Sequence, residues 1–81
     1  MHKNRLMWAS RRGMLELDLI LQPFVEQHYD NLSEADKSLF HSLLELEDQQ
    51  LFLNLVRREE STDPDVQRIV KIIHDSRTQP V

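Results

Sequence analysis

Three residues near the start of the chain combine groups suited to binding another polypeptide. Arg12 carries a planar guanidinium whose N–H groups match a carboxylate or a carbonyl oxygen. Gly13 is the only glycine of the 81 residues, and its missing side chain lets another backbone approach closely. Glu16 lies four residues after Arg12, so it can share a helix face with Arg12 and hold it, or accept hydrogen bonds from a partner. With the adjacent Arg11, these residues predict a binding patch.

Gly13 also has a purely structural interpretation. A glycine inside a helix costs about 1 kcal/mol relative to alanine. Arg11 and Arg12 would favourably end a first helix whose left-handed C′ residue is Gly13. If a helix instead begins near Gly13, these arginines oppose its dipole, and such local conflict is typical of functional sites. The residues alone support both interpretations equally.

Trp8 and Arg5 extend the predicted patch. They precede it by about one and two turns if the first two helical segments are roughly collinear. Tryptophan and arginine are favoured anchors of protein interfaces. Trp8 is explained equally well as a half-buried core residue, because aromatic side chains also dominate cores.

Catalytic and metal-binding patterns are absent from the sequence. No two of the histidines, His2, His28, His41 and His74, have the three- or four-residue spacing of metal ligands on one helix. One glycine cannot form a phosphate-binding loop, and no serine lies in a nucleophile elbow. We therefore expect a protein that is not an enzyme, with no catalytic residue, no metal and no stably bound cofactor.

Charge is distributed unevenly along the chain. Residues 1–12 carry +4 and the remainder carries −8, which gives the net charge of −4. An acidic body is repelled by nucleic acid and argues against a helix-turn-helix DNA reader, whereas the basic segment can meet an acidic protein surface. The apolar runs are far shorter than the roughly 20 residues of a membrane span. The absence of cysteine suits a reducing compartment, and we expect a cytoplasmic protein. We also expect a monomer.

The pattern of apolar residues predicts one all-α domain over residues 1–81, a compact bundle of five short helices with an ordered core of about 4–77. Glycine and proline are few, and no segment alternates apolar and polar residues for long. We expect helices over about 4–11, 14–30, 33–45, 48–58 and 62–77. The core positions expected on the second and fifth helices are Met14, Leu17, Leu21, Phe24, Val25, His28, Val66, Ile69, Val70 and Ile73.

Local signals set the expected helix ends. Ser33 followed by Asp36 approximates a capping box. Asp48 is suited to cap the fourth helix, and Pro64 suits the first turn of the fifth, after Thr62 or Asp63. The apolar stripe of the second helix continues past Pro23, which favours a kinked helix over a break at Gln22.

The order of these residues resembles a known family over about residues 5–75. The chain is similar to the small succinate dehydrogenase assembly factors of bacteria and mitochondria, whose Arg-Gly-x-x-Glu signature corresponds to Arg12, Gly13 and Glu16. The signature is short, and the flanking segments make it specific. Those segments are Arg5, Trp8 with Ala9, 11–18, Pro23 with Phe24, 29–33, 43–45, Asp48, and Leu51 with Phe52.

The resemblance implies a compact five-helix fold and a function that composition does not indicate. Family members bind the flavoprotein subunit of succinate dehydrogenase, and in bacteria also fumarate reductase. They promote covalent attachment of FAD to a histidine of that client. For this chain the resemblance implies a client-binding signature at Arg12, Gly13 and Glu16, with Arg5, Trp8 and Arg11 as neighbouring candidates.

One corner of the chain departs from the family pattern. Asn54 occupies a position where members commonly have tryptophan, and residues 57–60 replace a glycine-containing loop. The packing of that corner is therefore left open, whereas the signature is unaffected.

Two other functions compete with this interpretation. Relatives are also described as antitoxins that oppose a membrane-associated toxin acting on the bacterial cytoskeleton, which would make the chain a regulatory binding protein. An acidic adaptor without an enzyme client is the third possibility. Affinity capture distinguishes these functions. An assembly factor should capture a flavoprotein subunit, an antitoxin should capture a small membrane protein, and an adaptor should capture neither.

Overall fold

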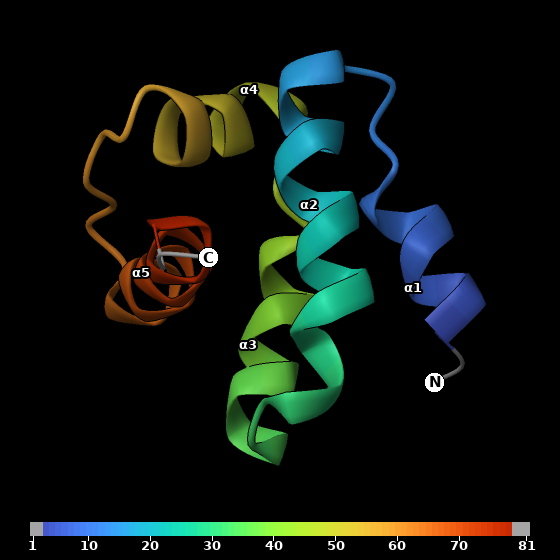
Figure 1. Ribbon diagram of the computed structural model, residues 1–81. Helices are drawn as coiled ribbons and strands as arrows, with labels where there is room; N and C mark the ends of the chain where they lie inside the picture. Colours follow the sequence, from blue (N-terminus) through green and yellow to red (C-terminus); the bar gives the residue numbers. More distant parts are fainter. Residues whose placement is uncertain (1–2, 79–81) are drawn as a thin grey trace.

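The predicted amphipathic segments form helices within residues 3–78, the part of the chain that the computed structural model describes. Between those residues there is no strand, so the prediction of an all-α bundle of five short helices is confirmed. The elements in chain order are α1 (Lys3–Ser10), α2 (Leu15–Gln27), the 3₁₀ turn η1 (Tyr29–Asn31), α3 (Glu34–Leu43), α4 (Asp48–Leu51), the π-helical η2 (Phe52–Val56) continuous with α4, and α5 (Pro64–Thr78) (Figure 1).

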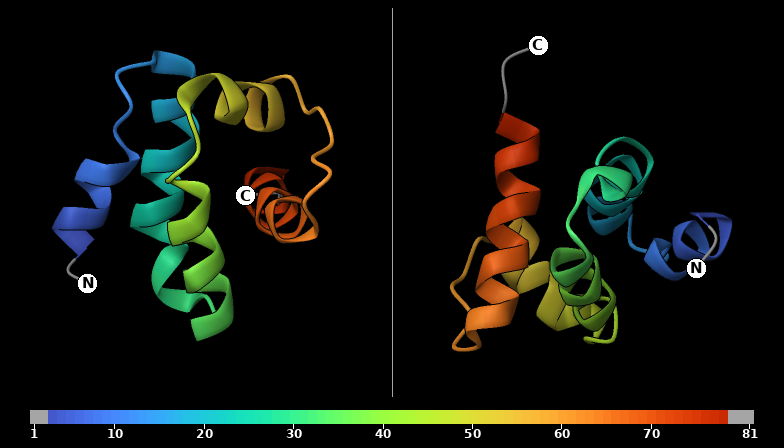
Figure 2. Two further views of the ribbon diagram at one scale, coloured as in Figure 1. Left: turned by 180° about the vertical axis from the view of Figure 1, so that it is seen from behind. Right: turned by 90° about the horizontal axis from the view of Figure 1, so that it is seen from below.

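Helix α2 lies at the centre of the bundle. It contacts α1 on one side and η2 and α5 on the other, while α5 also packs on α3. In the left view of Figure 2, α5 is seen nearly end-on below α4 and η2, and α1 lies at the opposite edge. The principal extents of 29 × 27 × 25 Å describe a nearly isotropic body. Because of this arrangement, the α1–α2 loop and the start of α4 lie against the same end of α2 (Figure 1).

The core collects apolar side chains from every α-helix. The rings of Phe24 on α2 and Phe40 on α3 lie 5.3 Å apart, and Tyr29 closes the cluster 5.8 Å from Phe40. Of the predicted core positions, Met14, His28 and Val66 are only partly buried. The buried apolar residues are Leu6, Leu17, Ile20, Leu21, Phe24, Val25, Tyr29, Phe40, Leu43, Leu44, Leu51, Leu55, Ile69, Val70 and Ile73.

Pro23 lies inside a continuous α2, as predicted, and no break occurs at Gln22. Proline has no N–H, so it leaves the carbonyl oxygen of Leu19 without its helical donor. The guanidinium of Arg77 donates to that oxygen at 3.2 Å, which joins the end of α5 to α2. The helix ends at Gln27, earlier than the predicted residue 30, because the chain tightens into η1.

The predicted caps of α3 and α5 are confirmed. Ser33 Oγ accepts a hydrogen bond from the Asp36 backbone N–H at 3.1 Å. Asp63 Oδ1 accepts one from the Asp65 N–H at 2.9 Å, and Pro64 is the first residue of α5. Helix α3 ends at Leu43, near the predicted residue 45. The expected end of the ordered core near residue 77 is not tested beyond Thr78, because residues 79–81 lie outside the described residues, as does His2.

The Asp36 carboxylate connects α3 to α5. It accepts hydrogen bonds from Arg68 Nε at 2.9 Å and Arg68 Nη2 at 3.3 Å. The pKa of Asp36 is lowered, first by these hydrogen bonds and then by the positive charge of Arg68, against the opposing effect of burial. In the unfolded chain the pKa returns to about 3.9.

We expect this pair to make stability depend on acidity. Because the folded pKa of Asp36 is the lower one, the pair contributes fully above about pH 5, and its contribution is lost as the pH falls through the folded pKa. Urea unfolding of the wild type between about pH 5 and pH 3 should therefore show a steeper loss of stability than Asp36→Asn. An equal loss of stability with falling pH in the two proteins would contradict the lowered pKa of Asp36.

The corner that departs from the family pattern is closed by Asn54. Its buried side chain accepts a hydrogen bond from Gln50 Nε2 at 2.8 Å and donates to the carbonyl oxygen of Glu59 at 2.9 Å. Within the loop, Arg58 has φ of 58°, a left-handed conformation that favours glycine. The loop thus keeps a glycine-like backbone without a glycine.

Replacing Arg58 with glycine should stabilise the protein. A left-handed conformation costs a non-glycine residue about 1–2 kcal/mol, and this exceeds the entropic cost of a new glycine, about 0.5–1 kcal/mol. We expect Arg58→Gly to raise the free energy of unfolding by about 0.5 kcal/mol. Arg57→Gly is the control, since Arg57 has φ of −82° and should lose about 0.5–1 kcal/mol on the same change. Urea unfolding measures both, and a loss of stability in Arg58→Gly would refute the prediction.

Residues 3–78 contain neither a membrane-spanning helix nor a cluster of metal-binding side chains. No helix there has the length and apolarity needed to cross a membrane. Nor does this part of the chain bring together three or more histidine, cysteine or acidic side chains that could hold a metal ion.

Candidate functional site

Gly13 lies in the loop between α1 and α2 and adopts φ of 79°. It is exposed, and a Cβ atom added to it would meet no other atom within 4 Å. Helix α1 already ends at Ser10, with the Arg11 N–H donating to the Trp8 carbonyl oxygen at 3.1 Å, so the interpretation of Gly13 as its C′ residue is wrong. The positive φ favours glycine, and the open space beside it leaves room for another molecule.

Arg12 is bound to its own chain. Its Nε donates to Asp48 Oδ1 at 2.9 Å. Its Nη1 donates to the carbonyl oxygens of Leu44 at 2.9 Å and Ala9 at 3.1 Å, and its Nη2 to that of Leu46 at 2.9 Å. Four of the five N–H groups of the guanidinium are thereby used, and the side chain is only 19% exposed. Arg12 therefore fastens the loop before α2 to the turn between α3 and α4.

Asp18 completes the attachment of the loop. Its Oδ1 accepts a hydrogen bond from the backbone N–H of Arg12 at 2.8 Å. Asp18 and Glu16 both lie in the first turn of α2, where negative charge stabilises the helix dipole. Together with Arg12, the carboxylates of Asp18 and Asp48 fix the backbone on the N-terminal side of Gly13.

The predicted helical pairing of Arg12 with Glu16 is wrong. Arg12 lies outside any helix, so the four-residue spacing does not bring the two side chains together. The Glu16 side chain is exposed and makes no hydrogen bond or ion pair with any residue of the described chain. Asp48 takes its place as the partner of Arg12, and it does not cap α4 as predicted, because Glu47 occupies the N-cap position without a side-chain bond.

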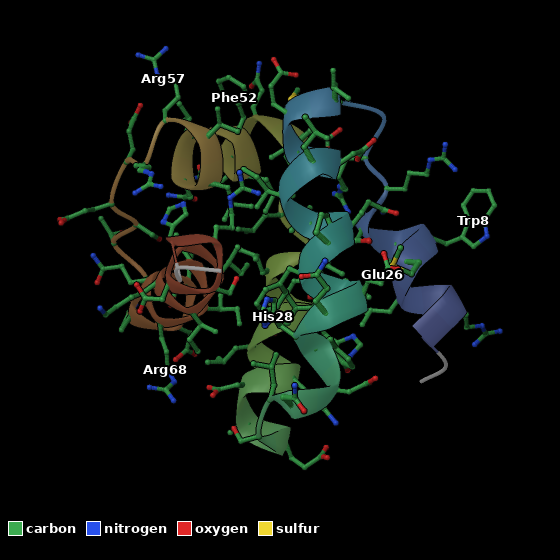
Figure 3. All side chains as sticks on the ribbon, viewed as in Figure 1. Trp8, Glu26, His28, Phe52, Arg57 and Arg68 are labelled. Atoms are coloured by element: carbon green, nitrogen blue, oxygen red, sulfur yellow. The ribbon has the colours of Figure 1, made fainter. Side chains whose placement is uncertain are left out.

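Helix α1 presents its remaining candidates to solvent. Trp8 is 75% exposed and points away from the rest of the molecule (Figure 3), so its interpretation as a core residue is wrong. Arg5 and Arg11 are exposed too. The inner face of α1 buries Leu6, and Gln22 Nε2 of α2 donates to the Met7 carbonyl oxygen at 3.0 Å and to Ser10 Oγ at 2.9 Å.

Comparison with known proteins identifies the family. The model of a family described as Sdh5, flavinator of succinate dehydrogenase, matches residues 4–77. The chain belongs to this family. The resemblance noted from the signature residues is thus confirmed.

Three similar proteins share the same name. The chain is 53% identical over 77 residues to the FAD assembly factor SdhE of Pseudomonas putida, covering 95% of this chain and 90% of that protein. It is 50% identical over 76 residues to the protein of that name in Pseudomonas aeruginosa, covering 94% and 89%. For the Shewanella oneidensis protein, also named FAD assembly factor SdhE, the identity is 52% over 66 residues, covering 82% and 80%.

In this member of the Sdh5 family, a shallow hollow lies beside the signature loop, the name used below for residues 11–14 between α1 and α2. It is lined by Met14 and Glu16 from the start of α2 and by Gln49, Phe52 and Leu53 from α4 and η2. The sequence did not reveal it, because its two walls are more than thirty residues apart in the chain. A second, larger groove separates η2 and its following loop from α5, and its walls include Arg58, Lys71 and His74.

Proposed function

We propose that the chain binds the flavoprotein subunit of succinate dehydrogenase through the surface around Gly13 and promotes covalent attachment of FAD to that subunit. The observation that carries the proposal is the open, left-handed Gly13 in a loop fixed by Arg12, in a chain of the Sdh5 family. A main chain of the client can approach this position because no side chain occupies it. Glu16, Arg11, Trp8 and Arg5 lie exposed in neighbouring segments as further contacts, and Arg12 retains one N–H for a client acceptor.

The contribution of this chain would be orientation. Holding the client so that its histidine and its bound FAD face each other lowers the entropic part of the barrier, while the flavin supplies the chemistry. The hollow beside Gly13 does not suit the pyrophosphate of FAD, because it is lined by three apolar side chains, the amide of Gln49 and the carboxylate of Glu16, with no cation. The proposal therefore places FAD on the client.

The test is covalent flavin on the client. The flavoprotein subunit is incubated with FAD, with and without this protein, and the flavin that survives denaturing electrophoresis is measured by its fluorescence. We expect a strong increase when the protein is present. Equal fluorescence in both samples would refute the proposal. The flavoprotein of fumarate reductase, tested in parallel, decides whether it is a second client.

Affinity capture and the flavin measurement also distinguish the proposed function from an antitoxin role. An antitoxin that opposes a membrane-associated toxin would capture a small membrane protein and leave flavin attachment unchanged.

We further propose that the chain acts as a cytoplasmic monomer. Its acidic surface supports this, since excess charge of one sign opposes self-association. Sedimentation at increasing protein concentration tests the monomer.

A further inference from the structure

The hollow beside the signature loop begins at the residue that follows Gly13. Met14 follows Gly13 directly and forms one wall of the hollow. The opposite wall consists of Gln49, Phe52 and Leu53, which belong to the helix that begins at Asp48, the residue held by Arg12. The Arg12 contacts therefore fix both the loop at Gly13 and the start of the helix that forms the far wall.

The lining combines an apolar floor with an acidic rim. Met14, Phe52 and Leu53 are partly exposed, so covering them removes apolar surface from water. Glu16 is exposed and has no partner among the described residues. The turn that leads into this wall adds Glu47, which is exposed as well. Such a lining is complementary to an apolar side chain with a positive charge beside it.

We propose that this hollow receives an apolar side chain of the flavoprotein client, with a lysine or arginine of the client within two residues of it paired to Glu16. The proposal rests on the proposed function and specifies its binding site. A client backbone lying against Gly13 places the neighbouring residues, 3.8 Å apart along the chain, over Met14 and the hollow. The two features thus form one surface, in which Gly13 admits the main chain and the hollow selects the side chain.

Filling the hollow tests the apolar part. Gln49 is exposed in the first turn of α4, so Gln49→Trp should fold normally and place an indole in the hollow. We expect at least tenfold weaker binding to the purified flavoprotein subunit, with an unchanged unfolding temperature. The matched control is Gln27→Trp, the same change at an exposed position at the other end of α2, which should bind as the wild type does.

Changing Glu16 tests the charged part. Glu16→Gln should weaken binding about three- to tenfold, and Glu16→Lys more, because reversal places like charges together. Glu16→Gln should also reduce the salt dependence of the dissociation constant, since salt screens charge pairs. A merely structural effect would instead lower the unfolding temperature and leave the salt dependence of binding unchanged.

The outcomes separate this proposal from the proposed function. If Gln49→Trp and the Glu16 variants bind like the wild type while Gly13→Arg does not bind, the hollow is not the site and the proposed function stands. If the wild type itself does not bind the flavoprotein subunit, both proposals fail. If Gln49→Trp self-associates differently from the wild type and binds the client as the wild type does, the occupant is a second copy and the inference is overturned.

Discussion

Replacing Arg12 with methionine will lower the free energy of unfolding by about 2–3 kcal/mol. The change removes the donors for the partly buried carbonyl oxygens of Leu44 and Leu46 and leaves the Asp48 carboxylate without its cation. A polar group left unsatisfied costs about 1–3 kcal/mol. Part of the loss is recovered, because Asp48 is 43% exposed and can be hydrated. For a domain with roughly 5–10 kcal/mol of stability, this is a severe loss.

Urea unfolding followed by circular dichroism measures the effect. The control is Arg11→Met, the same change at an exposed neighbour, and it should stay within about 0.5 kcal/mol of the wild type. Arg12→Lys keeps the charge without the planar fork, so it should restore less than half of the lost stability. If Arg12→Met is as stable as Arg11→Met, the loop does not depend on the Arg12 contacts.

Gly13→Arg should abolish binding of the flavoprotein subunit while the protein remains folded. The left-handed backbone at φ of 79° makes any side chain cost about 1–2 kcal/mol. The space around Gly13 is open, so the arginine has room in the free protein but fills the volume that a client backbone would enter. We expect at least a hundredfold loss of affinity and a loss of client flavin fluorescence.

Gly13→Asn separates strain from bulk. Asparagine tolerates the left-handed region and is short, so it should retain nearly wild-type stability and weaken binding less than arginine does. The prediction fails if Gly13→Arg binds the client with wild-type affinity. It also fails if Gly13→Asn loses binding as completely as Gly13→Arg, because bulk would then not be the cause.

Local features of the fold could be predicted from the sequence. The apolar spacing of Ile69, Val70 and Ile73 gave the correct inner face of α5, because one helical period fixes which residues share a face. The Ser33 cap was predictable for a similar reason, since it joins residues three apart. The sequence also indicates that Pro23 leaves the carbonyl oxygen of Leu19 without its helical donor, because the two residues are four apart. It does not indicate that Arg77 supplies the donor.

The site was predictable only in part. Gly13 stood out because it is the only glycine, but Arg12 was assigned a neighbour in sequence when its acid partner, Asp48, lies 36 residues away. The other acceptors of Arg12 are mainly backbone carbonyl oxygens, which every residue carries, so no residue type marks them. The positive φ of Arg58 escaped prediction because arginine gives no signal for it.

The structure suggests why the signature pairs an arginine with a glycine. The Arg12 contacts hold the loop in one conformation before any client arrives, so less ordering remains for the binding step. Gly13 then presents an open backbone at a fixed place beside the hollow. Under this account, loss of Arg12 weakens binding indirectly, through the loop, whereas substitution of Gly13 blocks it directly.

Hydrogen–deuterium exchange with and without the flavoprotein subunit shows whether the client covers Gly13 and the adjacent hollow. The first amides of α2 have no helical acceptor, so those of Leu15 and Glu16 should exchange rapidly in the free protein, as should that of Gly13. We expect the client to slow exchange over residues 13–16 and over 49–53. Unchanged exchange in both segments, with protection confined to the groove between η2 and α5, would contradict this expectation.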